Sequence, residues 1–293
     1  METLRCKAFL TAAESGSFTK AAEKLSYSPS GVSQLVTAFE KELGFSLFIR
    51  QKKGISLTTN GERLLPAVRE FLYREECIRQ LATDIRGLAA GDVRIATYSS
   101  IASHWLPEVI RDFKKDYPNI NITLMEGAKS DIIRYLEEKK ADIGFASNIE
   151  NTPYDWIHLD DDILIAVLPK DHPYADKDVY PLAECMHEDL IMSALGYDED
   201  ILEMFNKNGL HPTAKYKTIE SFAAMSMVEK SLGISIMNEL VTKNWKCDVA
   251  RIPLYPPEKI QFGLTVPDIG NTAPAVKKFI EYAVKRLKCI DNL

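Results

Sequence analysis

The sequence lacks the features that mark membrane proteins, disulfide scaffolds and metal-binding ribbons. No apolar run approaches the length that crosses a bilayer and the N-terminus has no signal-peptide core, so we expect a cytoplasmic protein. The five cysteines are scattered without a CxxC pair, which excludes a disulfide framework and argues against a zinc ribbon. We expect no bound metal and no cofactor.

The common catalytic motifs are also missing. There is no GxSxG, no HExxH and no glycine-rich phosphate loop, and the five histidines lie far apart in the sequence. Three adjacent aspartates, residues 160–162, lack the alternating spacing of a calcium loop and are expected to form a solvated acidic turn. The sequence therefore favours a binding protein over an enzyme.

Charge is unevenly distributed along the 293 residues, which are enough for two or three domains. Residues 1–64 carry nine Lys and Arg against six Glu, whereas the whole chain has a formal net charge of −6, so the remainder is at −9. A basic end joined to an acidic body is typical of a DNA-binding segment attached to a part that does not touch DNA.

The first sixty residues predict a helix-turn-helix. A stretch of apolar residues at helical spacing is closed by Gly16, and Ser17 or Thr19 can cap a second helix. A third helix, Gly31–Leu43, follows the capping residue Ser28. Two short helices, a tight turn and a capped third helix form the unit that places its last helix in the major groove.

A β-hairpin wing is expected next. Phe45–Arg50 and Ile55–Leu57 are short apolar runs joined by a basic turn that contains a glycine. Lys52 and Lys53 at its tip would meet phosphates, and removing both should weaken binding to all DNA sequences alike. A helical bundle with a solvated basic loop remains the alternative.

These residues resemble the DNA-binding head of LysR-type transcriptional regulators. The residues that carry the resemblance are Ser15 to Ala22, Leu25, Ser28, Val32, Ser33, Glu40, Leu43, Gly44, Leu47, Phe48, Arg50, Leu57, Thr58 and Gly61. Pro29, Gly31 and Leu35 depart from the family pattern, so base contacts are not carried over to positions 29 and 35. The candidate DNA-binding residues are Ser28, Ser30, Ser33, Gln34, Thr37, Arg50, Lys52 and Lys53.

A long helix is expected from Thr58 to about Leu88. Its apolar stripe exceeds what a small head can cover, and the resemblance implies pairing with the same helix of a second subunit. Packing inside the same chain is the alternative. Pro66 should bend this helix or mark its start, and residues 89–91 should form a hinge.

Beyond Gly91, strands and helices alternate, with for example a helix at Ser103–Asp116 and a strand near Ile163–Leu168, which predicts βαβ units and a parallel sheet. This half resembles the effector domain of the same family, through residues such as Leu106-Pro107, Asp142-Ile143-Gly144 and Gly233-Ile234. The resemblance implies an α/β fold of the periplasmic-binding-protein type with two subdomains. The predicted organisation is a winged helix-turn-helix at 1–58, a linker helix and hinge at 59–90, and an effector domain at 91–293, with subdomain I at 91–161 and 262–293 and subdomain II at 162–261.

A ligand should lie beyond the strand ends, where helices begin. The candidate effector-binding residues are Ser99, Ser100, Lys129, Ser130, Ser147, Asn148, Ser193, Glu220 and Ser221. Helix N-termini together with Lys129 suggest an anion such as a carboxylate, although Lys129 could equally pair with Glu126, Asp131 or Glu220. Serines before helices are also commonly simple caps.

The expected function is therefore a LysR-type regulator that binds operator DNA and a small-molecule effector. The family implies a homodimer or homotetramer, and RNA polymerase is a candidate further partner. A redox-responsive regulator of the same fold, sensing through Cys185 and Cys247, is the alternative. A stand-alone solute-binding protein would not need the helix-turn-helix, and a nucleoid-type binder would leave the acidic body unexplained.

Overall fold

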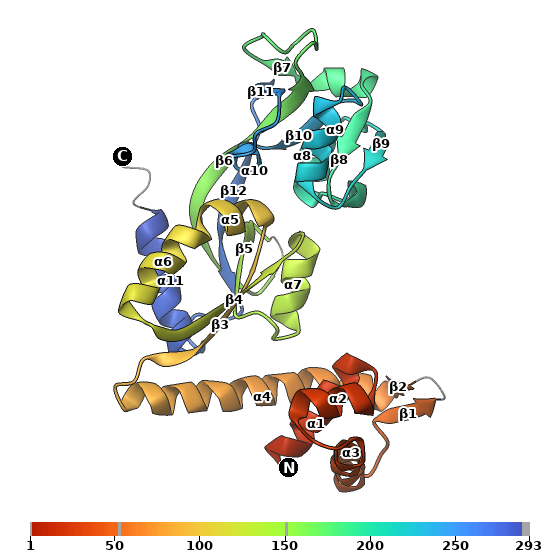
Figure 1. Cartoon of the computed structure of the whole chain (residues 1–293), viewed down its shortest axis with the longest axis vertical. Coiled ribbons are helices and arrows are strands. Elements are labelled where there is room, and N and C mark those ends of the chain that lie inside the picture. The colour runs from red at the N-terminus through yellow and green to blue at the C-terminus, as the bar shows by residue number, and fades with distance from the viewer. Residues whose placement is uncertain (1, 52–53, 150–151, 289–293) are drawn as a thin grey trace. The chain divides into compact units, whose positions relative to one another are not determined.

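The computed structural model describes residues 2–51, 54–149 and 152–288. The chain divides into two compact units, one ending at Leu88 and the other beginning at Ala89 (Figure 1). We call the first unit the head and the second the body. Among the described residues, no helix is both long enough and apolar enough to span a bilayer.

The head begins with three helices whose ends follow the local sequence. They are α1 (Thr3–Ser15), α2 (Phe18–Leu25) and α3 (Pro29–Leu43). The Ser17 hydroxyl accepts the N–H of Lys20 at the start of α2, and the Ser28 hydroxyl accepts the N–H of Gly31 at the start of α3. Gly16 ends α1 with a φ of 62°, a left-handed conformation that glycine adopts without strain. The expected caps are therefore present.

The wing is a two-stranded antiparallel hairpin, β1 (Phe48–Gln51) and β2 (Gly54–Leu57). Lys52 and Lys53, expected at its tip, lie outside the described residues. Phe48 is buried and packs against the α1–α3 core, so the hairpin is joined to the helices by apolar contact.

The long helix α4 (Thr59–Ile85) starts seven residues before Pro66, with Thr58 as its cap. Pro66 therefore lies inside α4 and does not mark its start. The first half of the apolar stripe packs against the head core, for example through Val68. The second half is exposed, and its apolar residues are Ile78, Leu81, Ile85 and, just beyond the helix, Leu88.

The body is built on a mixed eight-stranded sheet. Its path runs β4-β3-β5-β12-β6-β11-β7, and β10 pairs with β6 beside that path. Its strands are β3 (Ala90–Thr97), β4 (Asn119–Glu126), β5 (Ile143–Ser147), β6 (Asp155–Pro169), β7 (Tyr180–Pro181), β10 (Ser235–Asn238), β11 (Val249–Tyr255) and β12 (Lys259–Val266). A separate parallel pair is formed by β8 (Leu190–Met192) and β9 (Ala214–Lys217).

Helices flank these strands in the body (Figure 1). They are α5 (Ser99–His104), α6 (Leu106–Asp116), α7 (Lys129–Glu137), α8 (Glu199–Lys207), α9 (Ser221–Glu229), α10 (Glu239–Thr242) and α11 (Pro274–Leu287), with short 3-10 turns at Leu182–His187 and Ala194–Gly196. Residues 90 and 91, expected to be part of a hinge at 89–91, belong to β3.

Strands β6 and β12 connect two lobes of the body. Asp155 to Ile163 pair with β12, whereas Leu164 to Pro169 pair with β10 and β11. Lobe I contains β3, β4 and β5 with α5, α6, α7 and α11, and lobe II contains β7 to β11 with α8 and α9 (Figure 1). β3 is parallel to β4 and β5, as expected, but β12 is antiparallel to β5 and β6.

Two details of the body differ from expectation. The single helix expected at Ser103–Asp116 is divided between α5 and α6, because Pro107 lacks an N–H donor and is suited to the first turn of a new helix. The three aspartates at 160–162 lie within β6 and do not form a turn. Asp162 is buried, accepting the Asn238 amide at 2.7 Å and the Leu240 N–H at 2.9 Å.

Candidate functional sites

The exposed face of α3 is the candidate DNA-reading surface of the head. Ser30, Gln34 and Thr37 are exposed at helical spacing, so they lie on one face, while Leu35 packs against the head core. Ser28 is also exposed but is occupied as the cap of α3, with its Oγ 3.1 Å from the Ser30 Oγ.

Arg50 joins the wing to this face. Its Nη2 donates to the Ser33 Oγ at 3.2 Å and to the Thr37 Oγ1 at 3.3 Å. Its guanidinium carbon lies 5.4 Å from the centre of the Phe18 ring. The structure thus brings the permanent positive charge of Arg50 onto the polar face of α3. The sequence identified Arg50 as a candidate but did not show that it lies beside α3.

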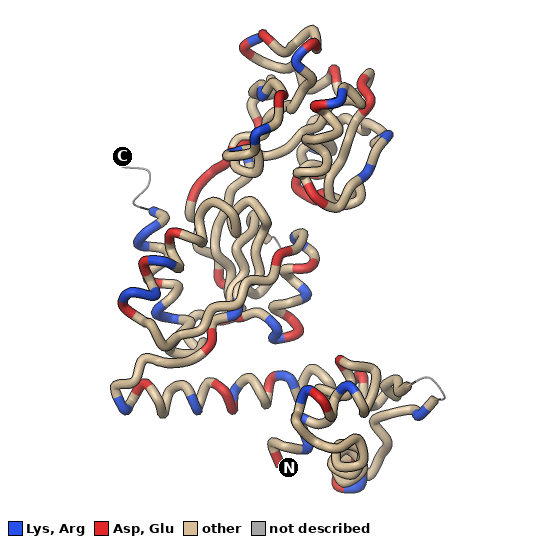
Figure 2. Tube along the Cα trace, in the orientation of Figure 1, with Lys and Arg blue, Asp and Glu red and all other residues tan. Residues whose placement is uncertain are grey.

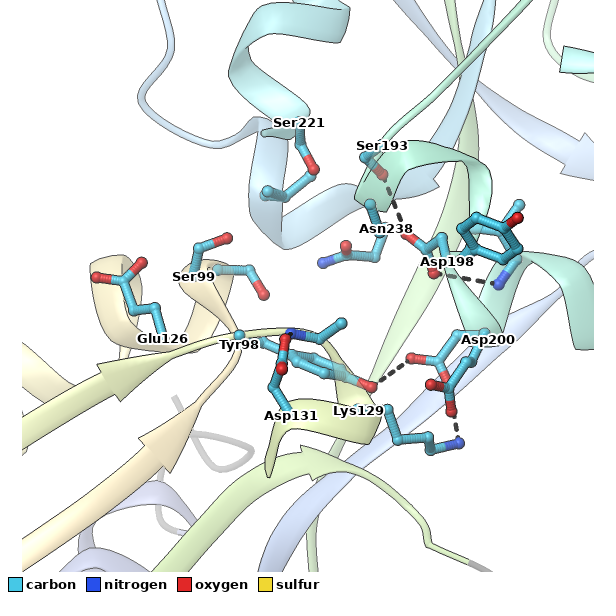
Figure 3. Close-up of a pocket in the computed structure, with 18 of the residues that line it drawn as sticks. Tyr98, Ser99, Glu126, Lys129, Asp131, Ser193, Asp198, Asp200, Ser221 and Asn238 are labelled. Carbon is cyan, nitrogen blue, oxygen red and sulfur yellow. Dashed lines mark hydrogen bonds and ion pairs between the residues drawn. The ribbon is translucent and has the colours of Figure 1, made fainter. Parts of the chain in front are cut away.

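A cavity of about 490 Å³ lies between the two lobes of the body (Figure 3). Seven predicted effector residues line it, namely Ser99, Ser100, Lys129, Ser130, Ser193, Glu220 and Ser221. The other two, Ser147 and Asn148, line a second cavity of about 200 Å³ that shares Lys129 and Asp200 with the first. Strand ends and helix starts from both lobes therefore converge around these cavities.

Asp200, which the sequence analysis did not select, lines both cavities and is hydrogen-bonded to several side chains there. It accepts hydrogen bonds from Lys129 Nζ at 3.1 Å, the Tyr98 hydroxyl at 2.9 Å and Ser147 Oγ at 2.7 Å (Figure 3). The side chains of Lys129 and Asp200 are only 12% and 9% exposed, so this ion pair is largely removed from water. Lys129 therefore pairs with Asp200 and with none of the three partners considered from the sequence.

Tyr98 is a lobe I residue whose hydroxyl is hydrogen-bonded to the same Asp200 carboxylate. Its pKa is raised well above the usual tyrosine value, first because the ring is buried and second because the Asp200 carboxylate is adjacent. The Tyr98 hydroxyl therefore remains protonated and acts as a hydrogen-bond donor.

Carboxylates of the chain occupy the N-terminal N–H groups of α7 and α8. The Ser130 N–H donates to Glu199 Oε1 at 3.2 Å, and the Ala128 N–H donates to Asp131 Oδ2 at 3.3 Å. At the start of α8, the Ile201 N–H donates to Asp198 Oδ1 at 3.4 Å. Residues 198–200 form a continuous acidic segment, visible as a red stretch where α8 begins in Figure 2.

Asp198 is a half-buried carboxyl with neutral partners. Besides the Ile201 N–H it accepts the Ser193 hydroxyl at 3.1 Å (Figure 3). Burial, and secondarily the charge of Asp200, raise its pKa. The ionised form of Asp198 therefore destabilises the folded body.

We expect Asp198→Asn to raise the melting temperature, most strongly at pH 8. Because the folded-state pKa of Asp198 is raised, its penalty is present above that pKa and disappears as pH falls to the unfolded value of about 3.9. Melting curves of both proteins from pH 8 down to pH 4 test this. Asp116→Asn, at the exposed end of α6, is the charge-matched control. A gain that stays constant across the range would contradict the assignment.

The cysteines expected as redox candidates have different surroundings. Cys185 is 1% exposed, and burial raises its pKa to about 12, which keeps it a protonated and weakly nucleophilic thiol. Cys247 is half-buried in lobe II. Within the described ranges, no group of three or more His, Cys, Asp or Glu side chains is arranged to hold a metal ion.

Comparison with known proteins places both units in one family. Residues 4–62 match the model described as "Bacterial regulatory helix-turn-helix protein, lysR family", and residues 86–288 match the "LysR substrate binding domain". The chain belongs to the LysR family of transcriptional regulators.

The chain is also similar to regulators along most of their length. The uncharacterized HTH-type transcriptional regulator YvbU of Bacillus subtilis (strain 168) is 32% identical over 288 residues, covering 97% of this chain and 98% of YvbU. The HTH-type transcriptional activator CmpR of Synechocystis sp. is 28% identical over 233 residues, covering 78% of this chain and 76% of CmpR.

Solved structures show the same fold. A full-length OxyR variant from Pseudomonas aeruginosa has a TM-score of 0.75 at 18% identity, covering 97% of this chain and 94% of OxyR. CbnR in complex with its target DNA has a TM-score of 0.67 at 19% identity, covering 98% of this chain and 99% of CbnR. The LysR-type fold expected from the sequence is therefore confirmed.

Proposed function

We propose that this LysR-family regulator binds an operator sequence through α3 and the wing, under control of a small molecule in the 490 Å³ cavity. The observation that carries the proposal is the exposed polar face of α3 with Arg50 hydrogen-bonded to it. A helix in the major groove can read bases through such side chains, and a nearby guanidinium can contact phosphate or guanine. Acting on DNA, the protein would work in the bacterial cytoplasm.

Dimerisation through α4 is part of the proposal. Ile78, Leu81 and Ile85 are exposed at a spacing that places them on one side of the helix. Burying this stripe against the same helix of a second subunit would remove it from water and present two heads to two half-sites. A tetramer would pair two such dimers. RNA polymerase would be a further partner at the promoter.

Control by the effector would act through the two lobes. A ligand between them that favours one arrangement shifts the population toward it by the difference in its affinity for the two arrangements. Strand β6 pairs with strands of both lobes and would carry that change. Burial of the Cys185 thiol argues against the redox alternative at this position.

The first test is selection of an operator from random duplex DNA with the full-length protein, followed by titration of Arg50→Ala. We expect affinity for the selected operator to fall about tenfold. The number of counterions released on binding, taken from the slope of log affinity against log salt concentration, should fall by about one, because one cation is removed from the DNA surface.

Arg111→Ala is the matched control for this titration. It removes the same charge from the exposed surface of α6 in the body and should leave operator affinity unchanged. Equal affinities for Arg50→Ala and the parent protein would overturn the proposed reading surface. Failure to select any common sequence would overturn sequence-specific binding itself.

A further inference from the structure

The cavity between the lobes carries an excess of negative charge. Six carboxylates line it, and Lys129 is the single Lys, Arg or His among its lining residues, all of which are described. The six are Glu126, Asp131, Asp198, Glu199, Asp200 and Glu220. Like charges at this density repel one another and attract a counter-ion.

Two of the groups that would bind an anion, Lys129 and the start of α7, are already engaged, whereas the starts of α5 and α9 have no side-chain cap. Lys129 is paired with Asp200, and the N–H groups of Ala128 and Ser130 at the start of α7 donate to Asp131 and Glu199. A carboxylate ligand at Lys129 or at α7 would have to displace one of the chain's own carboxylates, and one at α5 or α9 would still share the cavity with all six. The arrangement therefore disfavours the anionic effector that the sequence suggested.

Several acceptors of the cavity lack a cationic partner. Asp198 has only neutral partners, the Ser193 hydroxyl and backbone N–H groups, and the exposed carboxylates of Glu126 and Glu220 have no partner within the described part of the chain. Figure 3 places Glu126 on the lobe I side and Asp198 on the lobe II side of the same space. These groups can accept hydrogen bonds from a cation that enters between the lobes.

Ser100 independently indicates a polar ligand. Its side chain lines the cavity, the residue is 4% exposed, and its hydroxyl has no hydrogen-bond partner among the described residues. A hydroxyl that has no partner in the chain at the wall of a cavity is a position where a polar group of a ligand can bind. Apolar side chains, including Ile219, Val241 and Phe262, complete the walls and can contact a hydrocarbon portion.

We propose that the effector is an organic cation, with an ammonium or guanidinium group bound by Asp198 and by the exposed carboxylates Glu126 and Glu220 of the same cavity. This rests on the proposed function, in which this cavity is the effector site. A volume of about 490 Å³ accommodates a small metabolite. The apolar walls select a cation with a carbon skeleton over an inorganic ion.

The test uses the full-length protein and probes matched in skeleton but opposite in charge. Cadaverine is compared with glutarate and pentane-1,5-diol, and phenethylamine with 3-phenylpropionate, by thermal shift and calorimetry at constant ionic strength. Spermidine and agmatine extend the amine set, and calcium chloride tests a bare cation. We expect saturable binding of at least one amine and none of its acid or diol counterpart.

Single substitutions then show which carboxylates bind the amine. Asp198→Asn keeps an oxygen for the Ile201 N–H and should weaken amine binding about tenfold or more, because a charge-assisted hydrogen bond is lost. Glu220→Gln, at an exposed position that cannot disturb folding, should weaken it about threefold. Asp116→Asn, outside the cavity, should leave it unchanged.

Each contrary outcome is distinct. Binding of an acid in preference to its amine would overturn the cationic class while leaving the cavity as the effector site. Binding of calcium alone, amine binding that survives Asp198→Asn, or no response to any amine would also overturn it. Operator affinity measured on the same preparations reports the proposed function separately, because none of these variants alters α3 or the wing.

Discussion

Replacing Phe39 with alanine is expected to abolish operator binding while the body stays folded. Phe39 is fully buried on the inner face of α3, with its ring centroid 6.0 Å from that of Phe9. Truncating a buried phenylalanine costs about 3–5 kcal/mol, which approaches the whole stability of a unit of this size. The head should therefore unfold. Since the body has its own core, its melting transition should persist.

Circular dichroism melts combined with operator titration check this prediction. Gln34→Ala is the matched control, because Gln34 is exposed on the same helix. That variant should keep the head folded and lose only part of the affinity. A Phe39→Ala protein that binds the operator as tightly as its parent would show that α3 does not depend on this core.

Gly233→Ala should strongly destabilise the body. Gly233 has a φ of 154°, and a β-carbon added there would lie 1.9 Å from the carbonyl oxygen of Asp189. That oxygen accepts the N–H of Ile234 at 3.0 Å, in the contact that brings β8 beside the start of β10. Relieving the overlap requires moving backbone, so we expect a loss of roughly 3 kcal/mol or more. The melting temperature should fall by about 6–12 °C.

Gly209→Ala separates steric overlap from backbone conformation. Gly209 has a φ of 67°, but nothing lies within 4 Å of its added β-carbon. The left-handed conformation alone should cost about 1 kcal/mol. Thermal melts of both variants give the comparison, and equal losses would mean that the contact with Asp189 can relax at little cost.

Local signals made the head predictable from the sequence. Ser28 and Pro29 begin α3, and Gly16 and Gly44 end helices with positive φ, so each boundary is set by residues beside it. The departure at Leu35 also has a physical reason, because this side chain packs against the head core and is not available to bases.

The body was less predictable, because its sheet depends on pairings between distant segments. The strand β6 was expected only from Ile163, since the acidic run before it suppresses the alternation of apolar residues. In the structure that run pairs with β12, about 100 residues later, where Lys259 forms an ion pair with Asp161. β11 was missed, although its buried residues Ala250, Ile252 and Leu254 alternate with more exposed ones, because a proline inside a run argues against a strand.

The residues of the candidate cavity were likewise predictable only in part. Its serines and Lys129 were found because strand ends and helix starts can be located from neighbouring residues. Asp198 and Asp200 were missed, although three consecutive acidic residues at the start of α8 were a usable signal. The pairing of Asp200 with Tyr98 joins residues about 100 positions apart, which no local pattern encodes.

The contacts of Asp200 also bear on how the regulator would behave at low effector concentration. Asp200 belongs to lobe II, whereas its partners Lys129, Tyr98 and Ser147 all belong to lobe I, so the chain itself supplies bonds between the lobes. Their strength enters the balance between lobe arrangements whatever the effector adds. These four side chains would therefore set the basal level of transcription and the effector concentration at which the response begins.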